Sequence, residues 1–457
     1  MAERVRHRRR EGIIERGAIV WRRMTTGMRR LGLGAAIFAI AFVIGSVARV
    51  DQSAAARAVI AKVEAWRGPR FPSGDTLTVA DTLHARCGAL SGKDKVNCYD
   101  AQLLALRVQR GTRFAMGTLN RLTALDHDVA FTGHEYAHAI GIAAYKASRD
   151  VAGAFTSCTE ILQSGCYHGV IQTYLLSVPA IDSTAVNTVC KAWSAPDADR
   201  WLRFQCVHGM GHGLEMSLAH DLPKALAGCD LLVEEWDRKS CYGGAFMENV
   251  VFATDPSMAQ MVMGDEPGGH DMAMPSMTKY KMIDRSDPYY PCSAIGARYQ
   301  EDCWLMQPAV MLQIYDGDFD RTFKACDGAP VEWRAACYQG TGTEVSGATT
   351  MNHADAIAFC SRGSARWRPW CYTGVVKNFI DVTAKSADGI SFCKEIPDRP
   401  SQLKCYVSVG EEISVMRHAL ADRKPFCDVI TGDAEGRDAC LYGAQLPVKL
   451  PPGTPVE

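Results

Sequence analysis

The stretch Cys337–Trp370, CYQGTGTEVSGATTMNHADAIAFCSRGSARWRPW, decides the fold, because it is one of several similar stretches in the chain. It is 34 residues long, and the stretches that follow open with CYTG at Cys371 and CYVS at Cys405. A period near 34 residues is the length of a two-helix repeat unit. The same phrase also occurs earlier, as CYHG at Cys166, CVHG at Cys206 and CYGG at Cys241.

Each unit is expected to hold a long helix that starts at the second cysteine, such as Cys371–Thr383, then a turn and a shorter helix. Two antiparallel helices cannot bury their apolar faces alone, so such units stack around a continuous core. The sequence therefore predicts an all-α fold, an α-solenoid of about ten two-helix repeats. The period and the paired helices resemble tetratricopeptide and Sel1-like repeats in architecture, although the cysteine phrase belongs to neither pattern.

The 18 cysteines form successive pairs with none left over. No pair has the close CxxC spacing of a zinc or redox site, so we expect structural disulfides, one within each repeat, on the oxidising side of a membrane. One interval is two periods long, which places a repeat without cysteines at Thr132. The expected pairs are Cys87–Cys98, Cys158–Cys166, Cys190–Cys206, Cys229–Cys241, Cys292–Cys303, Cys326–Cys337, Cys360–Cys371, Cys393–Cys405 and Cys427–Cys440.

The N-terminus carries the signals of a membrane anchor. Residues 1–30 contain ten Arg and three Glu, and the uncharged run Leu31–Ala48 follows. A run of this length spans a bilayer as one helix, and the arginines before it place the N-terminus in the cytoplasm and the rest outside. We therefore expect a basic cytoplasmic segment at 1–30, a transmembrane anchor at 31–50, a stalk at 51–82 and the repeat domain at 83–457. A cleaved signal peptide is the alternative, because Ser46-Val47-Ala48 ends in small residues.

Composition excludes several classes of protein. With 22% charged residues and a single long apolar run, the chain is neither disordered nor a polytopic transporter. Residues 51–457 carry 39 basic and 48 acidic side chains. A nucleic-acid partner is therefore not expected.

The repeat register brings histidines together. His134 and His138, His168, and His208 and His212 occupy two equivalent positions of three consecutive repeats. Residues four apart share a helix face, and equivalent positions of stacked helices are neighbours. Imidazoles packed this closely without an ion would leave ring nitrogens unsatisfied. The sequence predicts a transition-metal site here, and neutral imidazole suits zinc, copper, iron and nickel alike.

His134-Glu135-Tyr136-Ala137-His138 also matches HExxH, in which two histidines bind zinc and the glutamate activates water. Glu160 is a candidate third ligand on this interpretation, and His168 of the next repeat is its rival. His208 and His212 repeat the histidine pair with Gly209 in place of the glutamate, which favours an explanation from the repeat. A zinc-dependent hydrolase with Glu135 as its catalytic base is thus the alternative function.

The interval between Cys241 and Cys303 exceeds the period, which indicates an insertion at about 258–290. Residues 258–282 hold seven methionines, and His270, Met272 and Met274 are the most ligand-like residues of the insertion. Thioethers favour copper, so the insertion is expected to form a copper-capturing lid, unless its methionines pack against the next repeat. Copper is therefore preferred over zinc. A third hypothesis is a scaffold without metal, whose concave face binds a protein partner.

Overall fold

The computed structural model describes residues 71–162, 164–195, 198–254, 281–383, 385–417 and 419–456. The chain divides into two compact units, Met1–Arg70 and Phe71–Glu457. The expected cytoplasmic segment, the anchor and the stalk up to residue 70 lie outside the described residues. In the described part, no helix has the length and apolar character needed to cross a membrane.

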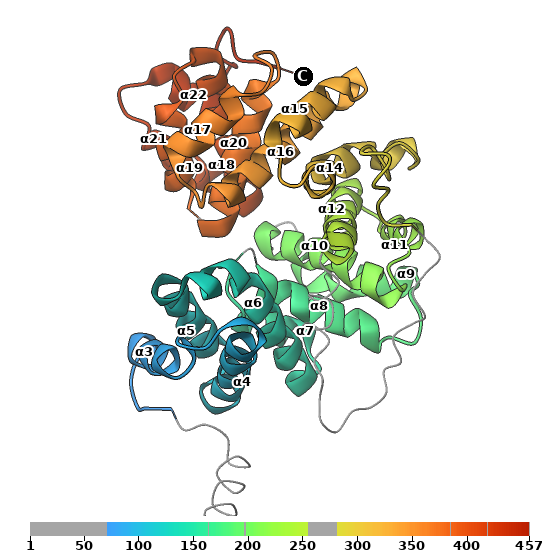
Figure 1. The fold of residues 1–457 in the computed structure, drawn as a ribbon, viewed down its shortest axis with the longest axis vertical. Coiled ribbons are helices and arrows are strands. Elements are labelled where there is room, and N and C mark those ends of the chain that lie inside the picture. The colour runs from blue at the N-terminus through green and yellow to red at the C-terminus, as the bar shows by residue number, and fades with distance from the viewer. Residues whose placement is uncertain are drawn as a thin grey trace, which may run out of the picture. The chain divides into compact units, whose positions relative to one another are not determined.

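The described part of Phe71–Glu457 is all-helical and contains no strand (Figure 1). Three helices come first, α3 (Thr76–Cys87), α4 (Gly92–Arg110) and α5 (Thr112–Leu125). Long helices then alternate with shorter ones along most of the chain. The long helices are α6 (His127–Ser148), α8 (Gly165–Ser177), α10 (Arg200–Ser217), α12 (Glu235–Thr254), α14 (Gln300–Ile314), α16 (Arg334–Ala348), α18 (Arg368–Thr383) and α20 (Arg399–Met416). The shorter helices are α7 (Val151–Ser157), α9 (Ser183–Val189), α11 (Leu222–Cys229), α15 (Phe319–Gly328), α17 (His353–Ser361), α19 (Ser386–Glu395), α21 (Lys424–Asp428) and α22 (Ala434–Gly443).

Each long helix packs against the next long helix. The contacts run in chain order, from α6 to α8, α10, α12, α14, α16, α18 and α20, and α22 packs on α20 (Figure 1). Five of the shorter helices, α7, α11, α15, α17 and α19, pack beside the long helices that precede and follow them. The repeat-like helical organisation expected from the cysteine phrase is therefore present, and it places equivalent positions of consecutive long helices side by side.

All nine predicted disulfides form. Most of them tie the end of one helix to the early turns of the next, as Cys360 at the end of α17 is tied to Cys371 in α18. The long helices begin earlier than predicted, because α18 starts at Arg368 and not at Cys371. The second cysteine thus lies inside its helix, where its side chain reaches across to the shorter helix.

The glycine of the repeated phrase allows long helices to touch backbone to backbone. A Cβ atom added at Gly169 on α8 would lie 2.2 Å from the carbonyl oxygen of His138 on α6. A Cβ atom added at Gly244 on α12 would lie 2.0 Å from the carbonyl oxygen of His208 on α10. No side chain fits at such distances, so glycine is required at these crossings. The close approach draws the side chains of neighbouring long helices toward one another.

Candidate metal centre

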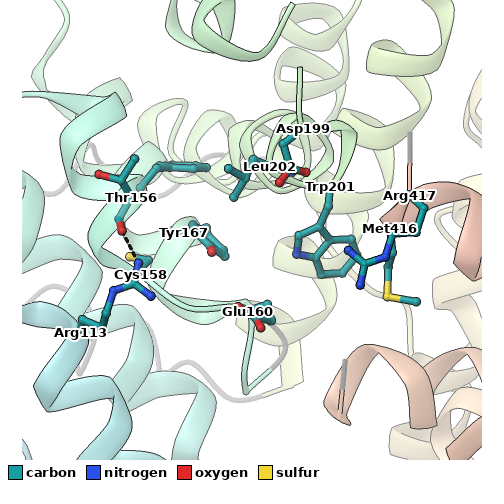
Figure 2. A pocket seen from close by; sticks show the side chains of 11 residues that line it. Arg113, Thr156, Cys158, Glu160, Tyr167, Asp199, Trp201, Leu202, Met416 and Arg417 are labelled. Carbon is teal, nitrogen blue, oxygen red and sulfur yellow. Dashed lines mark hydrogen bonds between the residues drawn. The ribbon is translucent and has the colours of Figure 1, made fainter. Parts of the chain in front are cut away.

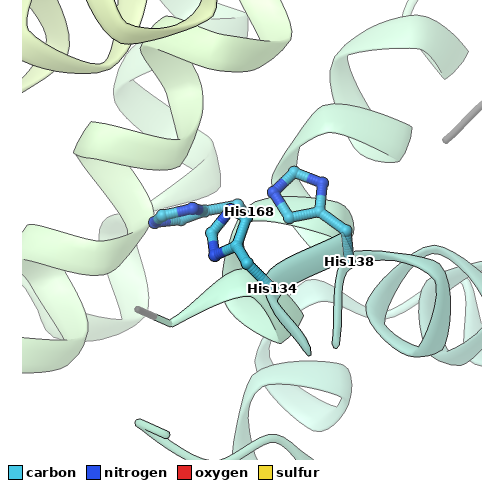
Figure 3. A group of neighbouring side chains, drawn as sticks. All are labelled: His134, His138 and His168. Atoms are coloured by element: carbon cyan, nitrogen blue, oxygen red, sulfur yellow. The ribbon is translucent and has the colours of Figure 1, made fainter. Parts of the chain in front are cut away.

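The five histidines of the repeat register gather in one place. His134 and His138 lie on α6, His168 on α8, and His208 and His212 on α10. Figure 3 shows how the α6 and α8 side chains converge from adjacent helices. Gln172, one turn after His168, fills the sixth position of the pattern. The residues that the sequence assigned to a metal site on these three helices are therefore brought together.

The imidazoles form two groups of three that share His168. In each group the nitrogens that face one another all lie within 4.8 Å. In the first group, His134, His138 and His168, the ring centroids are 4.8, 5.6 and 5.6 Å apart. In the second group, His168, His208 and His212, they are 5.2, 4.9 and 5.2 Å apart.

These spacings match a tetrahedral ion. A Zn–N bond of about 2.0 Å puts two ligand nitrogens about 3.3 Å apart and their ring centroids about 5.2 Å apart. The Nε2 atoms of His208 and His212 are 3.4 Å apart. The centroid separations within both groups, between 4.8 and 5.6 Å, scatter around the expected value. Small rotations of the rings would direct three nitrogens at one ion in either group.

Hydrogen bonds fix the tautomers of two of the rings. The Nδ1 of His134 lies 2.9 Å from the carbonyl oxygen of Leu162, and the Nδ1 of His212 lies 2.9 Å from Oε2 of Glu248. Both oxygens only accept, so the Nδ1 atoms carry the protons and the Nε2 atoms keep their lone pairs. A metal-binding histidine commonly has this arrangement, in which a carbonyl or carboxylate holds the second nitrogen.

The central rings are buried and incompletely satisfied. His138, His168 and His212 are 5, 3 and 3% exposed, whereas His134 and His208 are partly exposed. The Nε2 of His168 lies 3.2 Å from Oε1 of Gln205, and its Nδ1 has no hydrogen-bond partner in the described part of the chain. Among the same residues, neither nitrogen of His138 has a partner of good geometry. Buried nitrogens without partners are costly, and an ion would satisfy them.

Burial keeps four of the five rings neutral. Desolvation lowers the pKa of His134 to about 4 and that of His208 to about 3. It also lowers the pKa of His138 and of His168 well below the usual value, and repulsion from neighbouring histidines adds to the effect. Neutral imidazole is the form that binds metal, so these four rings are in the ligand state at neutral pH.

Three side chains beside the cluster were not predicted as part of the site. Glu248 on α12 holds His212, Gln205 holds His168, and the side-chain nitrogen of Gln172 contacts the sulfur of Met216. Glu248, Glu344 and Glu412 occupy the same position after the second cysteine of their repeats. Glu248 differs from the other two acidic residues because it lies opposite His212. That position depends on how α10 crosses α12, which the sequence does not specify.

Other predicted site residues are placed differently. Glu135 belongs to neither histidine group. Glu160 lines a separate cavity of about 420 Å³, shown in Figure 2, and none of the five histidines borders this cavity. His270, Met272 and Met274 lie outside the described residues. The cavity is formed by Arg113, Phe155, Thr156, Cys158, Glu160, Tyr167, Asp199, Trp201, Leu202, Met416 and Arg417.

Comparison of the chain with protein-family models, with curated proteins and with solved structures returns no match.

Proposed function

We propose that this chain binds a transition-metal ion through the histidine cluster of α6, α8 and α10. The observation that carries the proposal is the convergence of five imidazoles at tetrahedral spacing. Glu248 and the Leu162 carbonyl hold the outer nitrogens of two of these rings. Such a set of ligands is suited to zinc or copper.

Copper is the preferred metal in this proposal, because of the methionines at 258–282. The nine disulfides support an oxidising compartment outside the cytoplasm. The proposal includes an N-terminal anchor at 31–50, followed by a solenoid whose stacked long helices carry the metal. The ion is held on the rigid, disulfide-tied part of the protein.

A binding role is favoured over the HExxH hydrolase. A zinc hydrolase keeps an open coordination position for water, and its glutamate acts on that water. Here the histidine pair of α6 recurs on α10 as His208 and His212 with Gly209 in place of the glutamate, so the repeat explains the pair without a catalytic base. If the chain were a hydrolase, Glu135→Gln would abolish the turnover of peptides or esters while the protein kept its metal. On our account, neither the parent nor this variant turns over such substrates.

The test is metal analysis of the purified full-length chain and of the triple variant His134→Ala, His168→Ala and His208→Ala. We expect the parent to contain zinc or copper after loading and dialysis, and the triple variant to contain none while its far-UV circular dichroism is unchanged. His127→Ala is the matched control, since it removes an exposed histidine from the start of α6. Equal metal in parent and triple variant would refute the proposal.

A further inference from the structure

The two histidine groups cannot be treated as independent sites, because they share His168. His134 and His138 reach it from α6, and His208 and His212 reach it from α10. The groups are also in contact directly, since the rings of His138 and His212 are 6.2 Å apart. Two ions, one in each group, would both need a nitrogen of His168.

The structure offers only one nitrogen of His168 to a metal. Its Nε2 donates to Oε1 of Gln205 at 3.2 Å, which leaves the unpartnered Nδ1 as the atom with a free lone pair. A ring that bridges two ions must lose both of its protons and this hydrogen bond. The ring can therefore complete one group or the other, but not both together.

The charges around the cluster also suit a single ion. Glu248 bonds His212, and Glu215 lies one turn further along α10, within electrostatic reach of Glu248. Glu215 is 0% exposed, and neither of its carboxylate oxygens has a hydrogen-bond partner among the described residues. Buried charges must be compensated. Burial raises the pKa of Glu215 well above its usual value and keeps this side chain neutral, so Glu248 supplies the negative charge at the cluster. A second divalent ion would therefore add uncompensated positive charge in a buried site.

Both groups combine one partly exposed ring with two buried rings. One histidine of each group is partly exposed, His134 in the first and His208 in the second, while the others are buried. Each group thus has one ring at which an ion and solvent can exchange. The shared ring of His168 is buried.

On the basis of the proposed function, we propose that the cluster holds one ion at a time in two alternative positions, with His168 a ligand in both. The ion moves when His134 and His138 are replaced as ligands by His208 and His212. Only metal–nitrogen bonds break and form in this exchange, and no electron or proton is transferred. The arrangement suits a protein that takes up an ion in one position and passes it to the other.

The experiment is titration of the metal-free full-length chain with Co²⁺, whose visible absorption reports its ligand geometry. We expect one Co²⁺ per chain in the parent. His134→Ala and His208→Ala should each still bind one Co²⁺, with a Kd within about tenfold of the parent and with distinct spectra, because each keeps one group intact. His168→Gln should raise the Kd at least about 100-fold, since it breaks both groups.

His168→Gln keeps a polar side chain of the kind found at Gln172, and unchanged circular dichroism will show that it folds. His127→Ala should match the parent. Two Co²⁺ per chain in the parent would overturn the single-ion proposal. Loss of binding in either His134→Ala or His208→Ala would also overturn it, because the ion would then use only one of the two groups. A parent that binds no metal at all would contradict the proposed function itself.

Discussion

The Nδ1 of His212 donates to Oε2 of Glu248 across 2.9 Å, so that a carboxylate on α12 orients a ring on α10. Glu248 is 13% exposed at its side chain, and it makes His212 a better ligand by stabilising positive charge on the ring. The proposed metal site therefore extends over four consecutive long helices, although its histidines come from three of them.

Replacing Glu248 by Gln should weaken metal binding by about 10- to 100-fold, because the neutral amide orients the ring without supplying charge. The measurement is competition with a chromophoric chelator. Glu344→Gln is the matched control, since Glu344 occupies the equivalent position on α16, away from the histidines. An equal effect of both substitutions would show that Glu248 acts only on general stability.

Gly169→Ala should destabilise the protein by about 1–3 kcal/mol or more, because the added methyl group would overlap the carbonyl of His138. It should also reduce metal affinity, since α6 and α8 must separate. Gly347→Ala on α16 is the control, because its Cβ would meet no atom within 4 Å. A helical alanine there should be neutral or stabilise by up to about 1 kcal/mol. Thermal unfolding of both variants compares them, and equal Tm values would contradict the packing argument.

Two disulfides separate stability from metal binding. Cys190–Cys206 ends on α10, the helix that carries His208, whereas Cys326–Cys337 joins α15 to α16. Replacing either pair by serines should cost about 2–4 kcal/mol in urea unfolding. Only the loss of Cys190–Cys206 should also weaken metal binding, by loosening the start of α10. Equal metal affinity in the two double variants would show that the histidine helices do not depend on the local disulfide.

The sequence predicts much of this fold because the disulfide pairs and the repeat period are local. Cys360 and Cys371 are close in the chain, so their pairing follows from spacing alone. The register also predicts the gathering of His134, His168 and His208. It does not predict the start of α18 at Arg368, nor the contacts of Glu248 and Gln205, because these depend on where one helix crosses the next.

The metal-free protein should lose stability on acidification. His138 and His168 have their pKa held well below 6.5 by burial and by neighbouring histidines, so the unfolded chain takes up protons that the folded protein refuses. Their neutral state is fully compatible with folding above pH 6.5, and stability falls as the pH drops below that value. The slope should approach about 1.4 kcal/mol per pH unit for each such histidine.

Urea unfolding of the metal-free parent and of His168→Gln between about pH 7.5 and about pH 4.5 measures this effect. This range runs from about one unit above to about two units below the ordinary histidine pKa. The variant should show the shallower loss of stability. Identical slopes would mean that His168 is protonated in the folded protein.

The most direct test of the central claim is X-ray absorption spectroscopy of the full-length chain loaded with one equivalent of Zn²⁺ or Cu²⁺. The account predicts three or four nitrogen or oxygen neighbours at about 2.0–2.1 Å, with the outer-shell scattering of imidazole rings. In His168→Gln this imidazole signal should be lost. A first shell dominated by sulfur at about 2.3 Å, or one of oxygen without imidazole scattering, would contradict the assignment of the metal to the histidines of α6, α8 and α10.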